Sequence, residues 1–338
     1  MSAPISSRRG TKVVAVAALG LSLLATGLVS NSSASAATQT QIAYLSASSA
    51  NTWLQASRVQ MDKVAKVYGM KITEFDAQFK PGEQAKQIQD IIASGKYKGI
   101  IIASVDGAGI IPSLQAAIAK GIKVGILNQV VGTALDTAKP QFAGPSVVVM
   151  VPPKVSGERI GKLTLAACKG KTTCKVVYFY GIKGIPLDNA IKQGFDATIA
   201  SNPGIKIVAE GEGKYGGPDV AQKGMQDILA STPSFDVVVG ADQSIQGVVL
   251  ALTDANKLGA KLIGFGGSKA AINGIKSGVW FADLFGAPGT EGKLVMRGMA
   301  DAIRSGKVTG GIDPGSKMRD NGLVTAANVA RFTPEWNG

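Results

Sequence analysis

Short apolar runs with β propensity alternate with helical patterns through most of the chain. The runs span residues 71–77, 99–104, 123–127, 175–180, 206–209, 235–240 and 261–265. Helical patterns of roughly 12–18 residues lie between them. They cover residues 52–68, 81–94, 108–120, 153–168, 187–200, 218–230, 244–258 and 290–305. This alternation predicts right-handed βαβ crossovers and therefore parallel sheets.

The alternation stops around residues 132–151, a region with Pro140, Gly144 and Pro145, and it restarts at Pro153. At 338 residues the chain also has the length of two ordinary domains. We therefore predict an α/β fold of two doubly wound, parallel-sheet lobes. Ligands of open α/β sheets bind beyond the carboxyl ends of the strands, so two facing lobes would enclose one cleft.

The first residues have the composition of an export signal. Arg8, Arg9 and Lys12 precede an apolar run at 13–29, and a polar stretch leads to the small residues 34–36, Ala-Ser-Ala. This order predicts a signal peptide at residues 1–36, cleaved near Ala36. The alternative is an uncleaved anchor, although the run is about the shortest that could span a bilayer. We expect an exported, extracytoplasmic protein, in the periplasm or the cell envelope.

Composition excludes several kinds of chemistry. The chain has no histidine, which removes imidazole-based catalysis and the commonest zinc ligand sets. We expect no metal and no cofactor. The formal charge is +13, from 36 Lys and Arg against 23 Asp and Glu, but the basic residues are scattered. Without basic clusters interleaved with aromatic residues, we expect no nucleic-acid partner.

Cys168 and Cys174 are the two cysteines of the chain, six positions apart. They flank a short polar segment between a helical pattern and an apolar strand. Outside the cytoplasm such a pair is expected to form a local disulfide. The alternative is a redox pair, which usually has closer spacing and a helix N-terminus that lowers the thiol pKa.

A series of short motifs runs in a fixed order along the chain. They are 42–45 leading to Asn51-Thr52-Trp53, 84–92 leading to 99–102, 120–124 before Asn128, then 193–195, 240–242, 262–265, 275–278 and 291–292. Through these motifs residues 40–338 resemble the periplasmic sugar-binding protein family of ribose-binding-like type. These type I periplasmic binding proteins are the substrate-binding proteins of ABC transporters.

The resemblance implies a monomeric, non-enzymatic receptor whose two lobes are joined by a three-segment hinge. The chain would cross near residues 146–151, 283–286 and 311–315. Residues 37–147 and 285–312 would form the N-terminal lobe, and residues 148–284 and 313–338 the C-terminal lobe. Such a receptor closes on a small-molecule ligand and delivers it to an ABC importer permease.

Five residues are expected in the cleft because their residue types suit it. Asn51 matches a family asparagine, Trp53 a stacking aromatic residue and Tyr215 a second aromatic residue. Asp106 and Asp242 also follow strands at the predicted cleft. Trp53 could instead belong to the core of the first helix, and either aspartate could instead cap a helix.

Five other predicted cleft residues depart from the sugar-binding pattern. Asn128 stands where the family usually has Asp, Gln129 and Asn189 where it has Arg, Gly266 where it has Asp, and Phe285 near a usual Gln. Neutral or apolar residues thus replace most of the charged groups that bind sugar hydroxyls. We therefore expect a small neutral ligand, either sugar-like or a less polar or aromatic compound.

Two other functions use the same features. A ligand sensor would present its closed form to a signalling receptor instead of a permease. An exported hydrolase would need two carboxylates about 5–9.5 Å apart. The predicted cleft loops offer Asp106, Asp188 and Asp242 without an evident pair. We therefore expect a protein that is not an enzyme.

Overall fold

The computed structural model describes residues 39–232 and 234–338. The predicted signal peptide and its cleavage near Ala36 lie outside these residues. Within the described residues, no helix has the length and apolar character needed to cross a membrane.

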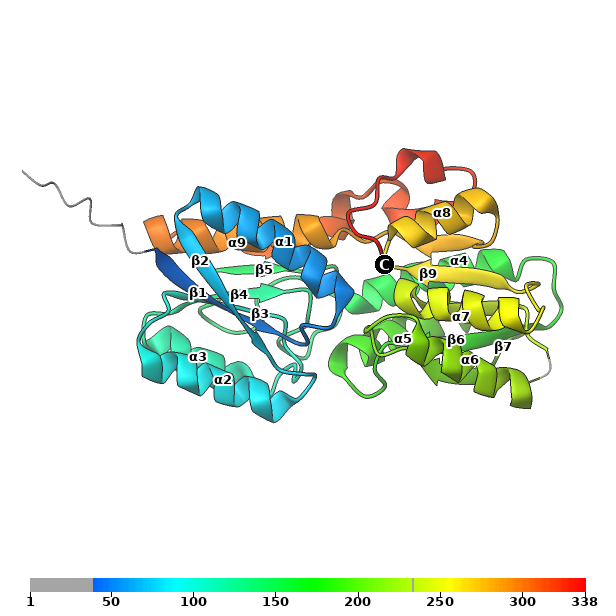
Figure 1. The fold of residues 1–338 in the computed structure, drawn as a ribbon, viewed down its shortest axis with the longest axis horizontal. Helices are drawn as coiled ribbons and strands as arrows, with labels where there is room; N and C mark the ends of the chain where they lie inside the picture. Colours follow the sequence, from blue (N-terminus) through cyan, green and yellow to red (C-terminus); the bar gives the residue numbers. More distant parts are fainter. Residues whose placement is uncertain (1–38, 233) are drawn as a thin grey trace, which may run out of the picture. The chain divides into compact units, whose positions relative to one another are not determined.

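The first sheet has six parallel strands in the order β11-β5-β4-β3-β1-β2. The strands are β1 (Thr40–Ser46), β2 (Met70–Asp76), β3 (Gly99–Ile102), β4 (Lys123–Leu127), β5 (Val147–Val149) and β11 (Gly310–Ile312). Helices α1 (Thr52–Val67) and α9 (Pro288–Ser305) cover one face. Helices α2 (Pro81–Ser94) and α3 (Ile111–Ala119) cover the other face (Figure 1).

The second sheet also has six strands, in the order β12-β10-β9-β8-β6-β7. They are β6 (Cys174–Tyr180), β7 (Ile205–Glu212), β8 (Val237–Ala241), β9 (Lys261–Phe265), β10 (Ala282–Leu284) and β12 (Leu323–Thr325). Strand β12 pairs antiparallel with β10, and the other pairings are parallel.

Helices cover both faces of the second sheet as well. Helices α4 (Pro153–Ala167) and α5 (Pro186–Ile199) cover one face, and α6 (Asp219–Ser231), α7 (Asp242–Asp254) and α8 (Lys269–Ser277) cover the other. Short 3-10 helices at Pro314–Lys317, Arg319–Gly322 and Val329–Arg331 belong to the C-terminal segment. Two parallel-sheet α/β lobes are the fold class that the sequence predicts.

Three connections join the two sheets. The chain leaves β5 for α4 through residues 150–152, leaves β10 for α9 through 285–287, and leaves β11 for β12 through 313–322. The first sheet is therefore completed by α9 and β11, which come from late in the sequence. The lobe limits predicted from the sequence, at residues 147, 284 and 312, remain a prediction.

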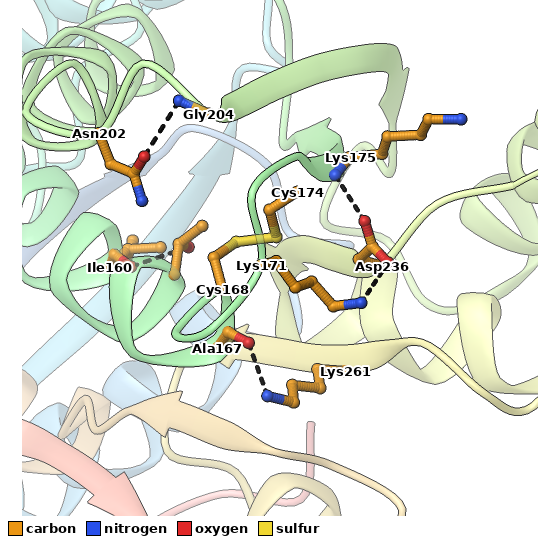
Figure 2. The surroundings of a disulfide bond; sticks show 11 residues. Ile160, Ala167, Cys168, Lys171, Cys174, Lys175, Asn202, Gly204, Asp236 and Lys261 are labelled. Carbon is orange, nitrogen blue, oxygen red and sulfur yellow. Dashed lines mark hydrogen bonds and ion pairs between the residues drawn. A yellow bond between two sulfur atoms is a disulfide. The ribbon is translucent and has the colours of Figure 1, made fainter.

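The predicted disulfide is present. Cys168 follows α4 and Cys174 begins β6, and their Cα atoms are 5.7 Å apart. Figure 2 shows Lys171, within the closed loop, beside Asp236, with 2.9 Å between Nζ and Oδ1. The Asp236 carboxylate also accepts a hydrogen bond from the Lys175 backbone N–H at 2.7 Å. The disulfide therefore lies at the amino end of β6, the end opposite Gly181.

Candidate functional site

Residues from both sheets line one cavity. Its volume is about 110 Å³. The first lobe contributes Asn51, Trp53, Asn128, Gln129 and Glu291. The second lobe and the connections contribute Val151, Pro153, Ser156, Arg159, Leu187, Ile191, Tyr215, Ala241, Gln243, Phe265, Gly266, Leu284, Phe285 and Gly286. Most of these residues follow the carboxyl end of a strand or begin a helix, as the fold predicts.

A side-chain hydrogen bond joins the two lobes beside this cavity. The Gln243 side-chain amide, in the first turn of α7, donates to Thr52 Oγ1 at 3.0 Å, and Thr52 is the first residue of α1. The N-termini of a first-lobe helix and a second-lobe helix therefore meet here. The structure thus has the lobes in contact across the cavity.

Asn51 is the N-cap of α1. Its Oδ1 accepts hydrogen bonds from the backbone N–H groups of Trp53 at 2.9 Å and Leu54 at 3.2 Å. Asparagine is favoured at this position because its side chain satisfies helix donors that have no intrahelical partner. The side-chain oxygen is thus engaged in the helix, and the Asn51 amide nitrogen is the group left to face a ligand.

Trp53 lines the cavity and also packs on a small apolar cluster that includes Leu54. Its Nε1 donates to Glu291 Oε2 at 3.3 Å. The ring lies against the connection between β10 and α9, because a Cβ on Gly286 would come within 2.3 Å of it. Trp53 therefore combines the two roles that the sequence left open, cavity lining and packing.

Glu291 is the acid of this cavity, and it was not among the predicted site residues. It lies in the first turn of α9, is 1% exposed, and accepts a second hydrogen bond from Asn128 Nδ2 at 3.1 Å. Burial raises the pKa of its carboxyl to about 8, although the bonds from Asn128 and Trp53 favour the charged form. Within the described residues it has no Lys or Arg ion-pair partner.

Asn128 and Gln129 follow β4 and lie in the cavity wall. Asn128 has a φ of 63°, in the left-handed region that asparagine tolerates better than most residues. Gln129 is buried, and its Nε2 donates to Asn128 Oδ1 at 3.3 Å. Together with Glu291 they form a hydrogen-bonded chain from Gln129 through Asn128 to Glu291.

Tyr215 reaches the cavity from the second lobe. Its hydroxyl donates to Asp188 Oδ1 at 2.6 Å. The same carboxylate accepts hydrogen bonds from the backbone N–H groups of Gly181 at 3.0 Å and Ile182 at 2.9 Å. Burial raises the pKa of Asp188 to about 6, and these hydrogen bonds oppose the rise. Asp188 thus holds the loop after β6 and fixes Tyr215.

Asp242 lies outside the cavity wall, and its side chain does not cap α7. It is fully buried, its Oδ2 accepts a hydrogen bond from Ser268 N at 2.7 Å, and Asp283 lies beside it. Asp283 Oδ2 accepts from Gly267 N at 2.9 Å. Burial raises the pKa of both carboxyls, and the charge of Asp242 raises that of Asp283 further. The prediction of Asp242 as a cap of α7 is wrong, because its carboxylate holds the loop after β9 instead.

Gly266 and Phe285 lie in the cavity wall, as expected from their positions after β9 and β10. Gly266 has a φ of 155°, and a Cβ there would lie 2.8 Å from both Asp242 Oδ2 and the Trp336 ring. Glycine is therefore required for backbone to approach the cavity at this point.

Asp106 and Asn189 lie outside the cavity wall. Asp106 is exposed, and helix α3 begins only at Ile111, so capping by Asp106 is also wrong. Asn189 lies within α5 rather than in the preceding loop, and its amide donates to the Gly184 carbonyl at 3.2 Å. Helix α5 begins at Pro186, which turns Asn189 away from the cavity.

Arg159 is the second charged residue that sequence reasoning missed. It projects from α4 into the cavity wall, and its Nη2 donates to the Gly315 carbonyl at 3.4 Å. Glu291 and Arg159 therefore place two ionisable side chains in a cavity that the sequence predicts to be mostly neutral. Within the described residues, no group of three or more His, Cys, Asp or Glu could hold a metal ion.

Comparisons with known proteins agree with this architecture. A family model described as periplasmic binding protein domain matches residues 42–307. The xylitol-binding protein of Mycolicibacterium smegmatis is 25% identical over 307 residues, covering 90% of this chain and 82% of its own length. The ribose import binding protein of Bacillus subtilis is 25% identical over 262 residues, covering 76% and 80%.

Solved structures share the fold. An ABC transporter solute-binding protein from Mycobacterium smegmatis with bound glycerol has a TM-score of 0.74 and 24% identity, covering 89% of this chain and 99% of that one. A Bacillus halodurans solute-binding protein with bound myo-inositol has a TM-score of 0.73 and 20% identity, covering 87% and 96%. The chain belongs to the periplasmic binding protein family, whose members are solute-binding proteins and not enzymes.

Proposed function

We propose that this protein is an exported receptor that closes on a small neutral ligand and delivers it to an ABC importer permease. The observation that carries the proposal is a cavity at the carboxyl ends of both sheets, lined from both lobes. A ligand held there contacts both lobes at once. Binding therefore favours the closed arrangement over any arrangement in which the lobes are apart.

The ligand class follows from the relatives and from the cavity wall. The relatives named above bind xylitol and ribose, and the solved structures hold glycerol and myo-inositol. A sugar or polyol is thus the first candidate. In this chain, however, the Asn51 oxygen and the Gln243 amide already have protein partners. Aromatic and aliphatic side chains make up much of the remaining wall, which favours a ligand with an apolar face and few hydroxyls.

A thermal-shift screen of residues 37–338 tests the proposal. The panel holds xylitol, ribose, glycerol and myo-inositol, and also aromatic acids, amides, nucleosides and sterol-like compounds. A ligand at about 100 times its Kd adds about 2.7 kcal/mol to the free energy of unfolding. Any compound that stabilises the protein is then titrated by calorimetry.

The outcomes separate the ligand classes. Binding of xylitol or ribose would assign a sugar or polyol receptor and would contradict a less polar ligand. Binding of apolar or aromatic compounds alone would support the wall argument. Asp106→Ala is the matched control, because this exposed residue lies outside the cavity and its loss should leave affinity unchanged. If nothing on the panel binds, the proposed ligand class is contradicted.

Export and cleavage are tested by N-terminal sequencing. The N-terminal sequence of protein recovered outside the cytoplasm should begin near residue 37. Recovery of a chain that still carries residues 1–36 would contradict cleavage near Ala36.

A further inference from the structure

The last residues of the chain contact the N-terminus of a second-lobe helix. The backbone N–H groups of Lys269 and Ala270, in the first turn of α8, donate to the carbonyls of Trp336 at 2.9 Å and Asn337 at 3.2 Å. These donors have no intrahelical partner in an α-helix. The C-terminal segment therefore completes the cap of α8, together with Ser268, whose side chain accepts from Ala271 N.

The same segment caps a helix of the first lobe. Glu335 accepts hydrogen bonds from Thr290 N at 2.7 Å through Oε2 and from Thr290 Oγ1 at 2.5 Å through Oε1. Thr290 lies in the first turn of α9, and Ala287, which precedes the helix, has a methyl side chain that cannot cap it. A carboxylate at a helix N-terminus is stabilised by the free N–H groups and the helix dipole. Glu335 thus anchors the segment to the helix that carries Glu291.

Trp336, the residue after Glu335, contacts two cavity-lining residues from outside the cavity. It is 7% exposed, and its Nε1 donates to the Gly266 carbonyl at 2.8 Å. Its ring meets that of Trp53 edge to face, with 5.4 Å between centroids and 75° between planes. Gly266 belongs to the second lobe and Trp53 to the first, and both line the cavity, whereas Trp336 lies outside it.

On these contacts, and resting on the proposed function, we propose that Glu335 and Trp336 are positioning residues of the ligand cavity. They hold Trp53 and Gly266 in the orientation that faces a ligand, and they tie the α8 and α9 N-termini to one short segment. Opening of the lobes that moves Trp53 away from Gly266 must break a contact of Trp336. The segment therefore stabilises the closed arrangement without touching the ligand.

The indole N–H signals of the three tryptophans give a test that needs no ligand. In ¹⁵N-tryptophan-labelled protein we assign the signals of Trp53, Trp280 and Trp336. In Trp336→Phe the Trp53 signal should shift and exchange faster with solvent, because its neighbouring ring and the Gly266 contact change. Glu335→Ala should move the Trp53 and Trp336 signals in the same way. The Trp280 signal, from a residue packed against Gly264 and Gly274, should stay in place.

Affinity for xylitol gives the second readout. Trp336→Ala and Glu335→Ala should weaken it by roughly twofold to tenfold, as expected for loss of an aromatic pair or a helix cap. Thr333→Ala, an exposed neighbour in the same segment, is the matched control and should bind as the wild type does. Trp336→Phe preserves a ring and should recover part of the affinity lost in Trp336→Ala, which separates positioning from a loss of folding.

Two results would overturn the inference. One is an unchanged Trp53 signal in both Trp336→Phe and Glu335→Ala. The other is a Trp280 signal that moves as much as the Trp53 signal, which would indicate general loss of structure. Failure of the wild type to bind xylitol would count against the ligand class proposed above, and the spectra of the unliganded protein would still decide the role of the segment.

Discussion

The two lobes build their shares of the cavity in different ways. The first lobe supplies polar side chains directly, with Asn51, Asn128 and Glu291 in the wall. The second lobe buries its acids one layer behind the wall, where Asp188 and Asp242 bind the backbone N–H groups of loops. The first lobe therefore supplies the acid of the cavity wall, whereas the second lobe supplies Arg159 and keeps its acids behind the wall, where they fix the shape of its loops. Substitutions of acids in the two lobes should accordingly have separable effects on binding and on stability.

The largest expected effect concerns Glu291. Its pKa rises from 4.5 to about 8 on folding, because the carboxyl is buried. The unfolded chain therefore loses this proton near pH 4.5, while the folded chain keeps it until about pH 8. The free energy of unfolding should fall as pH rises through this window, by up to about 5 kcal/mol. In Glu291→Gln this loss should be absent, so the variant gains stability relative to the wild type as pH rises, measured by urea unfolding between pH 4.5 and 8.

Asp283→Asn is the matched variant in the second lobe. The pKa of Asp283 is also raised by burial, so the loss of stability with rising pH should again be smaller than in the wild type. Only Glu291→Gln should change the pH dependence of ligand affinity. Parallel stability curves for the wild type and Glu291→Gln would contradict the buried, protonated carboxyl.

The disulfide gives the next effect, and it belongs to the second lobe alone. Replacing both Cys168 and Cys174 by Ala should lower the free energy of unfolding by about 2 kcal/mol, because a short loop in the unfolded chain is released. Affinity should stay unchanged, since the bond lies at the amino end of β6, away from the cavity. Calorimetry and urea unfolding measure the two quantities. A variant that lost affinity while keeping its stability would contradict this separation.

Trp53→Ala in the first lobe should weaken binding of whichever compound the thermal-shift screen identifies. We expect a loss of more than about 1 kcal/mol if the ring stacks on the ligand. Trp53→Phe keeps an aromatic face but loses the bond to Glu291, so its affinity should fall between those of the wild type and Trp53→Ala. Lost stability at unchanged affinity would make Trp53 a packing residue only.

Tyr215→Phe in the second lobe should have the smallest effect. The ring that lines the cavity remains, so affinity should change little. Loss of the hydroxyl bond to Asp188 should cost about 1 kcal/mol of stability at pH 7. It should also raise the pKa of Asp188 above about 6, because that bond favours the charged form. An NMR titration of the carboxyl tests this, and an affinity loss as large as that of Trp53→Ala would refute the shape role.

Sequence patterns predict the architecture because its central strands are apolar on both faces and its helices are amphipathic. They miss β5, β10, β11 and β12, since strands of three residues are too short to show a period. Residues Ile42–Leu45 are identified from the sequence only as part of the family motif and not as a strand, although they belong to β1.

The predicted residues that line the cavity share one origin. Asn128, Gly266 and Phe285 come directly after strands and Asn51 ends the loop between β1 and α1, and the fold places such loops at the cavity. Glu291 and Arg159 were missed because they reach the cavity from helices, and only tertiary packing brings them there. Asp242 was misassigned because the loop that binds its carboxylate, at Ser268, is 26 residues away. A charged side chain near a cleft can bind a backbone N–H group that is distant in the sequence, and local sequence does not reveal that partner.

The order of the elements along the chain has a consequence for folding during synthesis. The first sheet needs α9 and β11, which follow strands β6 to β10 of the second sheet in the sequence. A polypeptide that emerges N-terminus first leaves one apolar face of β3, β4 and β5 without α9 until the chain up to β10 has emerged. The first lobe, whose first strands appear before any of the second lobe, is therefore completed only after α9 and β11 have emerged.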